Sequence, residues 1–146
     1  MQPSRAMTLA AVCTGVLAGC GSDSTGIESD IVGTWHATRF EFVNNANPAN
    51  TVEAIALGAS VTIIFNANHT FSLTLTLPGQ PPEVSTGTYV VTATTLTITV
   101  TSETPVQTLN FTMSLSGNTL TLTGGATTFD FGTGEVAATI NVTATR

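Results

Sequence analysis

Hydrophobic and polar residues alternate one by one along most of the chain after Asp30. In residues 71–77, Phe and Leu alternate with Ser and Thr, and the same period of two recurs in residues 96–100, 109–115 and 119–123. A period of two places successive side chains on opposite faces of a strand, so each run predicts a strand with one buried and one solvated face. Threonine, a β-branched residue that suits such strands, fills most of the polar positions. The pattern therefore predicts an all-β fold.

Turn residues separate these runs at short intervals. Gly117-Asn118 is typical of a two-residue hairpin connection, and residues 66–69 and 132–134 separate further runs. The Pro-Gly-Gln-Pro-Pro stretch at 78–82 cannot be strand. Because nearly all of the roughly eight to ten expected strands follow one another directly, we expect an antiparallel meander. Closing the meander into an up-and-down barrel would remove its exposed edges. A β-sandwich of adhesin type is the alternative, but only a barrel pairs the first strand with the last.

Residues 44–59 interrupt the alternation. The Asn-rich part, residues 44–50, predicts a loop. Residues 51–57 predict a short helix with Thr51 as its N-cap and Gly58 at its end. We expect this helix or loop, which follows the first strand, to lie over one mouth of the barrel.

The N-terminal nineteen residues have the three parts of an export signal. Arg5 supplies the positive start, residues 6–17 are apolar or small, and Ala18 and Gly19 are the narrow residues that a peptidase requires. The apolar run is too short to span a bilayer as a helix. We therefore expect residues 1–19 to be a signal peptide that is removed.

The Leu-Ala-Gly-Cys sequence at 17–20 resembles a bacterial lipobox. The resemblance implies cleavage between Gly19 and Cys20 and attachment of lipid to Cys20, which would hold the protein at a membrane of the cell envelope. Gly21 in place of an aspartate implies the outer membrane of a Gram-negative bacterium. The other cysteine, Cys13, lies in the signal, so the mature protein would contain no disulfide. Residues 20–29 then read as the lipidated cysteine and a flexible tether, and residues 30–146 as one domain.

Several motifs of this domain resemble those of lipocalins and lipocalin-like domains of bacterial lipoproteins. Gly33-Thr34-Trp35 is similar to their Gly-x-Trp signature, residues 65–71 to a recurring hairpin, and residues 87–89 and 118–122 to recurring strand starts. The resemblance covers roughly residues 30–146 and implies a lipocalin-like barrel.

Two positions of the resemblance carry specific expectations. His69 stands where a glycine is usual, and we expect it to adopt the positive φ needed there. The resemblance also implies a basic residue that packs across Trp35, and Arg146 is the candidate in the last strand. Such a cation–π contact is worth roughly 0.5–2 kcal/mol.

Composition and spacing argue against several classes of function. Nine acidic residues face only three basic ones, for a formal net charge of −6, so nucleic-acid phosphates would be repelled. His36 and His69 are the only histidines and lack metal-ligand spacing. The sequence contains no Gly-x-Ser-x-Gly elbow and no paired carboxylates suited to acid–base chemistry. We therefore expect a protein that is not an enzyme and holds no metal or cofactor.

The inward register of the strands indicates a hydrophobic interior that is either filled or holds one small ligand. No charge falls clearly among the inward positions, so a ligand is expected to be apolar or weakly polar. We expect a monomer that binds such a ligand, and the alternative is a filled barrel that acts as an interaction or structural module of the envelope. The residues expected to line a ligand site are Phe65, Phe71, Leu73, Leu75, Tyr89, Leu109, Phe111 and Met113.

Overall fold

A computed structural model describes residues 24–146, which form one helix and nine strands. The signal peptide, the cleavage site at Gly19 and the lipid-attachment site at Cys20 lie outside the described residues and stay predictions. The elements are α1 (Ser24–Ile31), β1 (Gly33–Asn44), β2 (Thr51–Glu53), β3 (Ser60–Phe65), β4 (Thr70–Thr76), β5 (Glu83–Val91), β6 (Thr95–Val100), β7 (Gln107–Ser116), β8 (Thr119–Asp130) and β9 (Glu135–Thr145).

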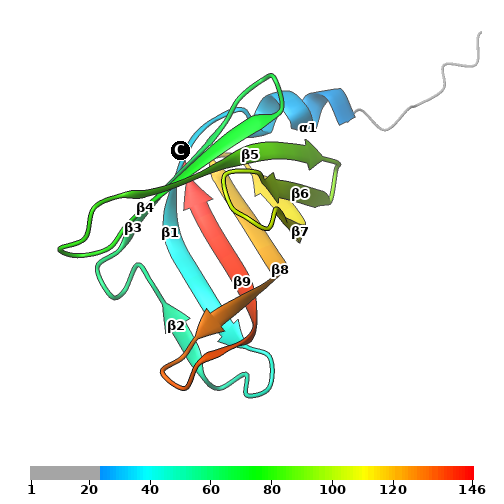
Figure 1. Ribbon diagram of the computed structural model, residues 1–146. Helices are drawn as coiled ribbons and strands as arrows, with labels where there is room; N and C mark the ends of the chain where they lie inside the picture. The colour runs from blue at the N-terminus through cyan, green and yellow to red at the C-terminus, as the bar shows by residue number, and fades with distance from the viewer. Residues whose placement is uncertain (1–23) are drawn as a thin grey trace, which may run out of the picture.

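Eight of the strands form a closed antiparallel barrel. Strands β3 to β9 pair each with the next along the chain, β1 pairs with β3, and β1 also pairs with β9 from His36 to Asn44. In Figure 1 the long strands β1, β9 and β8 lie side by side as one wall, and β3 to β7 complete the circuit. The pairing of the first strand with the last confirms the predicted up-and-down barrel and rules out the β-sandwich.

The two ends of the barrel differ. At one end, which we call the closed end, β1 begins and β9 finishes, and α1 is drawn beside it in Figure 1. At the opposite end, the mouth, lie the connections at 45–50, 54–59, 77–82, 101–106 and 131–134. Strands β1, β4, β6 and β8 run toward the mouth, and β3, β5, β7 and β9 run away from it.

Strand β2 lies outside the barrel circuit and widens the wall near the mouth. β1 pairs with β3 only over Gly33–His36, and over Glu41–Val43 the same edge of β1 pairs with β2. Residues 51–57 therefore form a short strand and a turn in place of the predicted helix, and the loop alternative holds for residues 54–59. A single hydrogen-bonded turn follows, in which the carbonyl of Ala54 accepts from the N–H groups of Leu57 (3.1 Å) and Ala59 (3.0 Å). Gly58 ends it with a φ of 91°, as its predicted place at the end of the segment requires.

The segment expected to be a flexible tether is helical in its second half. Residues 24–29 belong to α1, which continues to Ile31. Ile31 is fully buried, and Ile27 packs against the core, so the apolar side chains of the helix contact the barrel. The sequence did not predict this helix because the segment is short and mostly polar, and only two isoleucines, one helical turn apart, dock it on the barrel.

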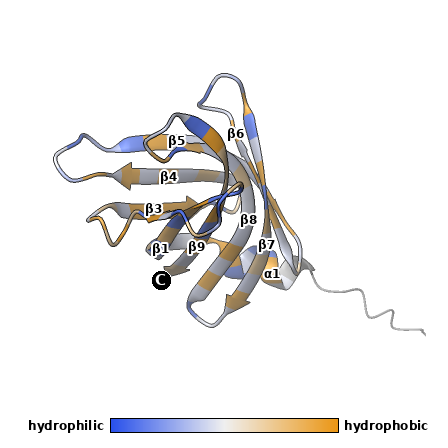
Figure 2. Ribbon diagram, turned by 90° about the horizontal axis from the view of Figure 1, so that it is seen from below, coloured by the Kyte–Doolittle hydropathy of each residue, from blue (hydrophilic) through white to orange (hydrophobic). Residues whose placement is uncertain are grey.

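Alternation of hydrophobic and polar positions is visible along the strands in Figure 2. All buried side chains among the described residues are hydrophobic. The largest fully buried ones are Trp35, Phe65, Ile31, Ile63, Leu96, Leu120 and Leu122. They come from α1, β1, β3, β6 and β8, mostly near the closed end, so that end of the barrel is filled.

The turns at His69 and Gly117 have the backbone geometry that the sequence predicts. His69 has a φ of 63° and is the single non-glycine residue with a positive φ among the described residues. Its N–H donates to the carbonyl of Asn66 (3.1 Å), which closes the β3–β4 hairpin. Gly117, in the β7–β8 hairpin, has a φ of 57°. Both local predictions are confirmed.

Candidate functional site

An open cavity of about 500 Å³ lies at the mouth of the barrel. Its wall comes from β1, β4, β5, β6, β7, β8 and β9, so seven of the eight barrel strands contribute. The hydrophobic lining residues are Phe40, Phe42, Phe71, Leu73, Leu75, Ile98, Val100, Leu109, Phe129 and Ile140, and the polar ones are Glu83, Ser85, Glu103, Gln107, Thr127, Thr128 and Glu135. The cavity falls in the size range of small-molecule sites, roughly 300–1,000 Å³, and like them it is mostly apolar.

Aromatic rings form one side of the cavity. The ring of Phe42 on β1 stacks on that of Phe129 on β8, with 4.1 Å between centroids and 19° between planes. Phe40 meets Phe42 edge to face at 5.4 Å, and Phe131 meets Phe129 in the same way at 4.9 Å. These contacts join strands that flank β9, so the rings hold that part of the wall together. The rings of Phe40, Phe42 and Phe129 line the cavity.

Four of the eight predicted lining residues line this cavity, namely Phe71, Leu73, Leu75 and Leu109. The other four, Phe65, Tyr89, Phe111 and Met113, do not line this cavity. They also point inward, but they pack in the core away from the open space. Alternation identifies which residues of a strand point inward, but not how far along the barrel axis each one lies. The sequence therefore could not distinguish inward residues at the filled end from those at the open end.

Sequence reasoning missed two aromatic lining residues on β1. Phe40 and Phe42 follow a register shift between Ala37 and Arg39, which breaks the alternation that begins at Trp35. A bulge of this kind inserts an extra residue and restarts the pattern. The spacing of the two phenylalanines could have identified them as a pair on one face of the strand, because residues two apart in a strand share a face.

Three carboxylates also lie along the cavity, which corrects the expectation that it carries no charge. Glu83 begins β5, Glu135 begins β9, and Glu103 belongs to the β6–β7 connection. The hydroxyl of Ser85 donates to Glu103 (3.2 Å). These residues are exposed and lie at the mouth end of their segments, so they belong to the rim of the cavity.

Other acidic groups near the mouth have partners within the protein. Glu53 accepts from the backbone N–H groups of Phe40 (2.7 Å), Ile55 (3.2 Å) and Ala56 (2.5 Å). Burial raises the pKa of Glu53, but these three donors and the nearby charge of Arg39 outweigh burial, so the pKa lies below its ordinary value.

Asp130 and Glu41 also have partners within the protein. Asp130 accepts from the backbone N–H groups of Gly132 (2.7 Å) and Gly134 (2.9 Å), and these bonds lower its pKa. Glu41 pairs with Arg39 at 2.6 Å, the only ion pair within residues 24–146. These three carboxylates therefore stabilise the loops and walls of the mouth.

The closed end is held by the contact expected between Arg146 and Trp35. The guanidinium carbon of Arg146 lies 4.7 Å from the centroid of the fully buried Trp35 ring. The same guanidinium donates to the carbonyls of Asp30 (2.8 Å) and Val32 (3.3 Å), and the indole N–H of Trp35 donates to the carbonyl of Ile31 (2.8 Å). Gly33, the first residue of the signature, has a φ of 138° that favours glycine. These residues close the barrel and lie away from the cavity.

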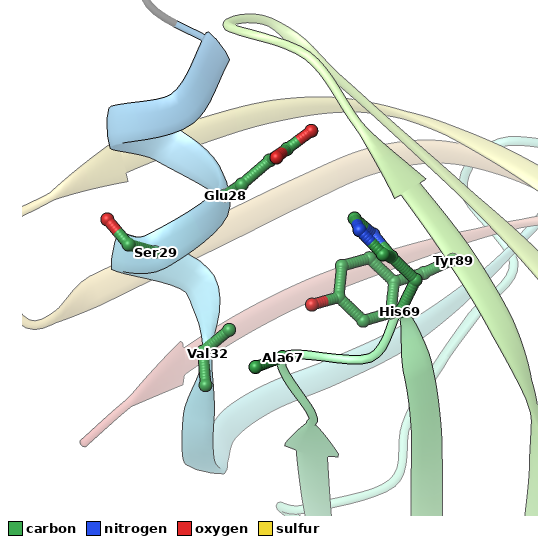
Figure 3. Close-up of a pocket in the computed structure, with 6 residues that line it drawn as sticks. All are labelled: Glu28, Ser29, Val32, Ala67, His69 and Tyr89. Atoms are coloured by element: carbon green, nitrogen blue, oxygen red, sulfur yellow. The ribbon is translucent and has the colours of Figure 1, made fainter.

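A second, smaller hollow of about 230 Å³ lies at the closed end, between α1 and the β3–β4 turn. Figure 3 shows Glu28, Ser29 and Val32 on one side of it and Ala67, His69 and Tyr89 on the other. The hydroxyl of Tyr89 donates to the carbonyl of Asn66 (2.8 Å). Burial raises the pKa of Tyr89, and the charge of Glu28 raises it further. Tyr89 is thus a structural residue of the closed end and does not line the cavity at the mouth.

A family model for the lipocalin-like domain matches residues 31–143. No curated protein and no solved structure gives a match to the chain. Over the part of the chain that the structure describes, no helix has the length and hydrophobicity needed to cross a bilayer. Within that same part, no three His, Cys, Asp or Glu side chains converge closely enough to hold a metal ion.

Proposed function

The chain belongs to the lipocalin-like domain family, and from this premise we propose that the barrel binds one small, mainly apolar molecule in the cavity at its mouth and does so without catalysis. The observation that carries the proposal is the unequal filling of the barrel. Large side chains fill the closed end, whereas about 500 Å³ at the mouth is open and lined largely by Phe, Leu, Ile and Val. Burying an apolar molecule there would gain roughly 25 cal/mol for each Å² of apolar surface removed from water.

The cavity favours this function over a filled barrel that serves only as an interaction module. A filled barrel would leave no room for a ligand, and the inward side chains near the mouth would touch one another across the interior. Here Leu73, Leu75 and Leu109 remain only partly buried although they point inward. Incompletely buried inward leucines leave apolar surface available to a ligand.

The proposal includes a place of action. Cleavage after Gly19 and lipid attachment at Cys20 would fix the barrel at the surface of an envelope membrane, in keeping with the lipobox resemblance of residues 17–20. Replacing Cys20 by alanine should then release the protein from membranes and abolish fatty-acid labelling. Labelling that persists in Cys20→Ala would disprove the anchor without bearing on the cavity.

Titration with a neutral hydrophobic fluorophore, N-phenyl-1-naphthylamine, tests the cavity directly. The full chain carrying Cys20→Ala has no attached lipid, and the titration is run without detergent, which would compete for an apolar site. We expect saturable binding of one probe per chain. Leu73→Trp places a large ring in the cavity and should weaken binding about tenfold or more, the effect of losing about 1.4 kcal/mol.

The matched control is Thr74→Trp, which adds a ring of the same size to the next residue of β4. Thr74 alternates with Leu73 and Leu75, so its side chain lies on the outer face of the wall. Probe binding to Thr74→Trp should equal that of the parent. Absence of saturable binding to the parent, or equal binding by the two tryptophan variants, would disprove the proposed site.

A further inference from the structure

The charge of the cavity rim restricts which apolar molecules fit it. Glu83, Glu103 and Glu135 come from three segments well separated in sequence, and the barrel brings all three to one cavity. None of the residues that line the cavity is basic. An apolar interior that opens past carboxylates of one sign favours a cation at the rim and repels an anion.

The three rim carboxylates differ from the other acidic groups near the mouth. Glu41 is paired with Arg39, Glu53 accepts three backbone N–H groups, and Asp130 accepts two. Those contacts show that each of these three carboxylates stabilises the fold. Glu83 and Glu135 make no ion pair within residues 24–146, and Glu103 receives only the neutral hydroxyl of Ser85. Their charge is therefore available to a molecule at the mouth.

The arrangement suits an organic cation better than a metal ion. A metal would require several carboxylates close together, and the described part of the chain contains no such group. An ammonium head on a hydrocarbon body needs only a negative potential at the rim and an apolar space beneath it. The rings of Phe42 and Phe129 line the same cavity, and aromatic rings attract cations.

On these grounds, and resting on the proposed function, we infer that the ligand is an amphiphile with a positively charged head, such as an alkylamine or alkylammonium compound. The alkyl body lies against Leu73, Leu75 and Leu109, and the head lies at the rim beside Glu83, Glu103 and Glu135. Free fatty acids, which carry the opposite charge, should bind more weakly because the same rim repels them.

Three ligands with the same ten-carbon chain test the inference by isothermal titration calorimetry on the full chain carrying Cys20→Ala. They are decyltrimethylammonium, decanol and decanoate, each below its aggregation concentration. At low ionic strength the cation should bind about tenfold or more tightly than the anion, with decanol between them, and added salt should narrow the difference because it screens rim charges.

Paired charge variants locate the effect. Glu83→Gln with Glu135→Gln should lower the affinity for decyltrimethylammonium about fivefold or more while leaving that for decanol unchanged. The matched control, Glu28→Gln with Asp30→Asn, removes two negative charges at the closed end and should preserve both affinities.

The outcomes separate this inference from the proposed function. If decanol binds but the three ligands bind equally, or if the closed-end control loses as much cation affinity as the mouth pair, the inference is wrong and the apolar cavity stands. If none of the three ligands binds, the proposed function and the inference both fail.

Discussion

Replacing Gly125 by alanine should destabilise the barrel by a clash with one identified ring. Gly125 follows the register shift in β8 and pairs with Ile140 of β9. A Cβ built on it lies 2.5 Å from Cζ and 3.0 Å from Cδ1 of Phe111, and closer still to Cε1. Because Phe111 is 5% exposed and packed in the core, its ring cannot swing into solvent.

The expected change in the free energy of unfolding is the difference between two opposing effects. Overpacking of this kind costs about 1–3 kcal/mol. The backbone of Gly125 has no positive φ, so alanine also gains about 0.4–1 kcal/mol by restricting the unfolded chain. The net loss in the free energy of unfolding should be about 1–2 kcal/mol, measurable by urea denaturation.

Gly124→Ala is a matched control with a different mechanism. Gly124 has a φ of 85° and nothing within 4 Å of an added Cβ, so alanine there costs about 1–2 kcal/mol through backbone strain alone. Phe111→Leu, which shortens the clashing side chain, should reduce the cost of Gly125→Ala by about 1 kcal/mol or more and leave the cost of Gly124→Ala unchanged. If Gly125→Ala costs the same in the parent and in the Phe111→Leu background, the packing argument is refuted.

Three other perturbations have defined outcomes. Arg146→Ala removes a cation–π contact to Trp35 and two hydrogen bonds. It should lower the free energy of unfolding by about 1–2 kcal/mol. An unchanged thermal midpoint would show that the C-terminal residue does not close the barrel. The pKa of Glu53 lies below its ordinary value of 4.5 because backbone donors outweigh burial, which acts the other way. Its carboxylate therefore stabilises the fold above pH 4.5, and this contribution is lost as the pH falls through the lower folded pKa. Urea denaturation should accordingly find Glu53→Gln less stable than the parent at pH 7, with the gap closing in acid, whereas a gap independent of pH would contradict this role. Gly87→Ala places a Cβ on the carbonyl oxygen of Thr99 in the paired strand β6. It should lower the free energy of unfolding by about 2 kcal/mol or more, or abolish soluble expression. Normal stability in urea would show that β5 and β6 are not paired as described.

Local patterns in the sequence were sufficient to predict the fold class. Alternation with a period of two and short turn signals identified the strands between residues 60 and 146, and the resemblance to lipocalin-like domains predicted the positive φ of His69. These features depend on neighbours in the chain, so they are readable without a tertiary structure. Alpha helix α1 and strand β2 were missed because each depends on docking to a barrel that already exists.

The candidate site required the tertiary structure. Leu109 and Phe111 occupy equivalent positions in one alternating strand, yet Leu109 lines the cavity and Phe111 is buried in the core. Their depth depends on the register of every strand, on the bulges in β1 and β8, and on which end the helix covers. Glu83, Glu103 and Glu135 lie along one cavity only because separate hairpins end at the same mouth. The sequence by itself determined that the chain forms strands with one apolar face, because the alternation of residues is a local property. The closure of the barrel decided where the apolar faces leave a cavity and which charges surround it, because both depend on contacts between distant residues.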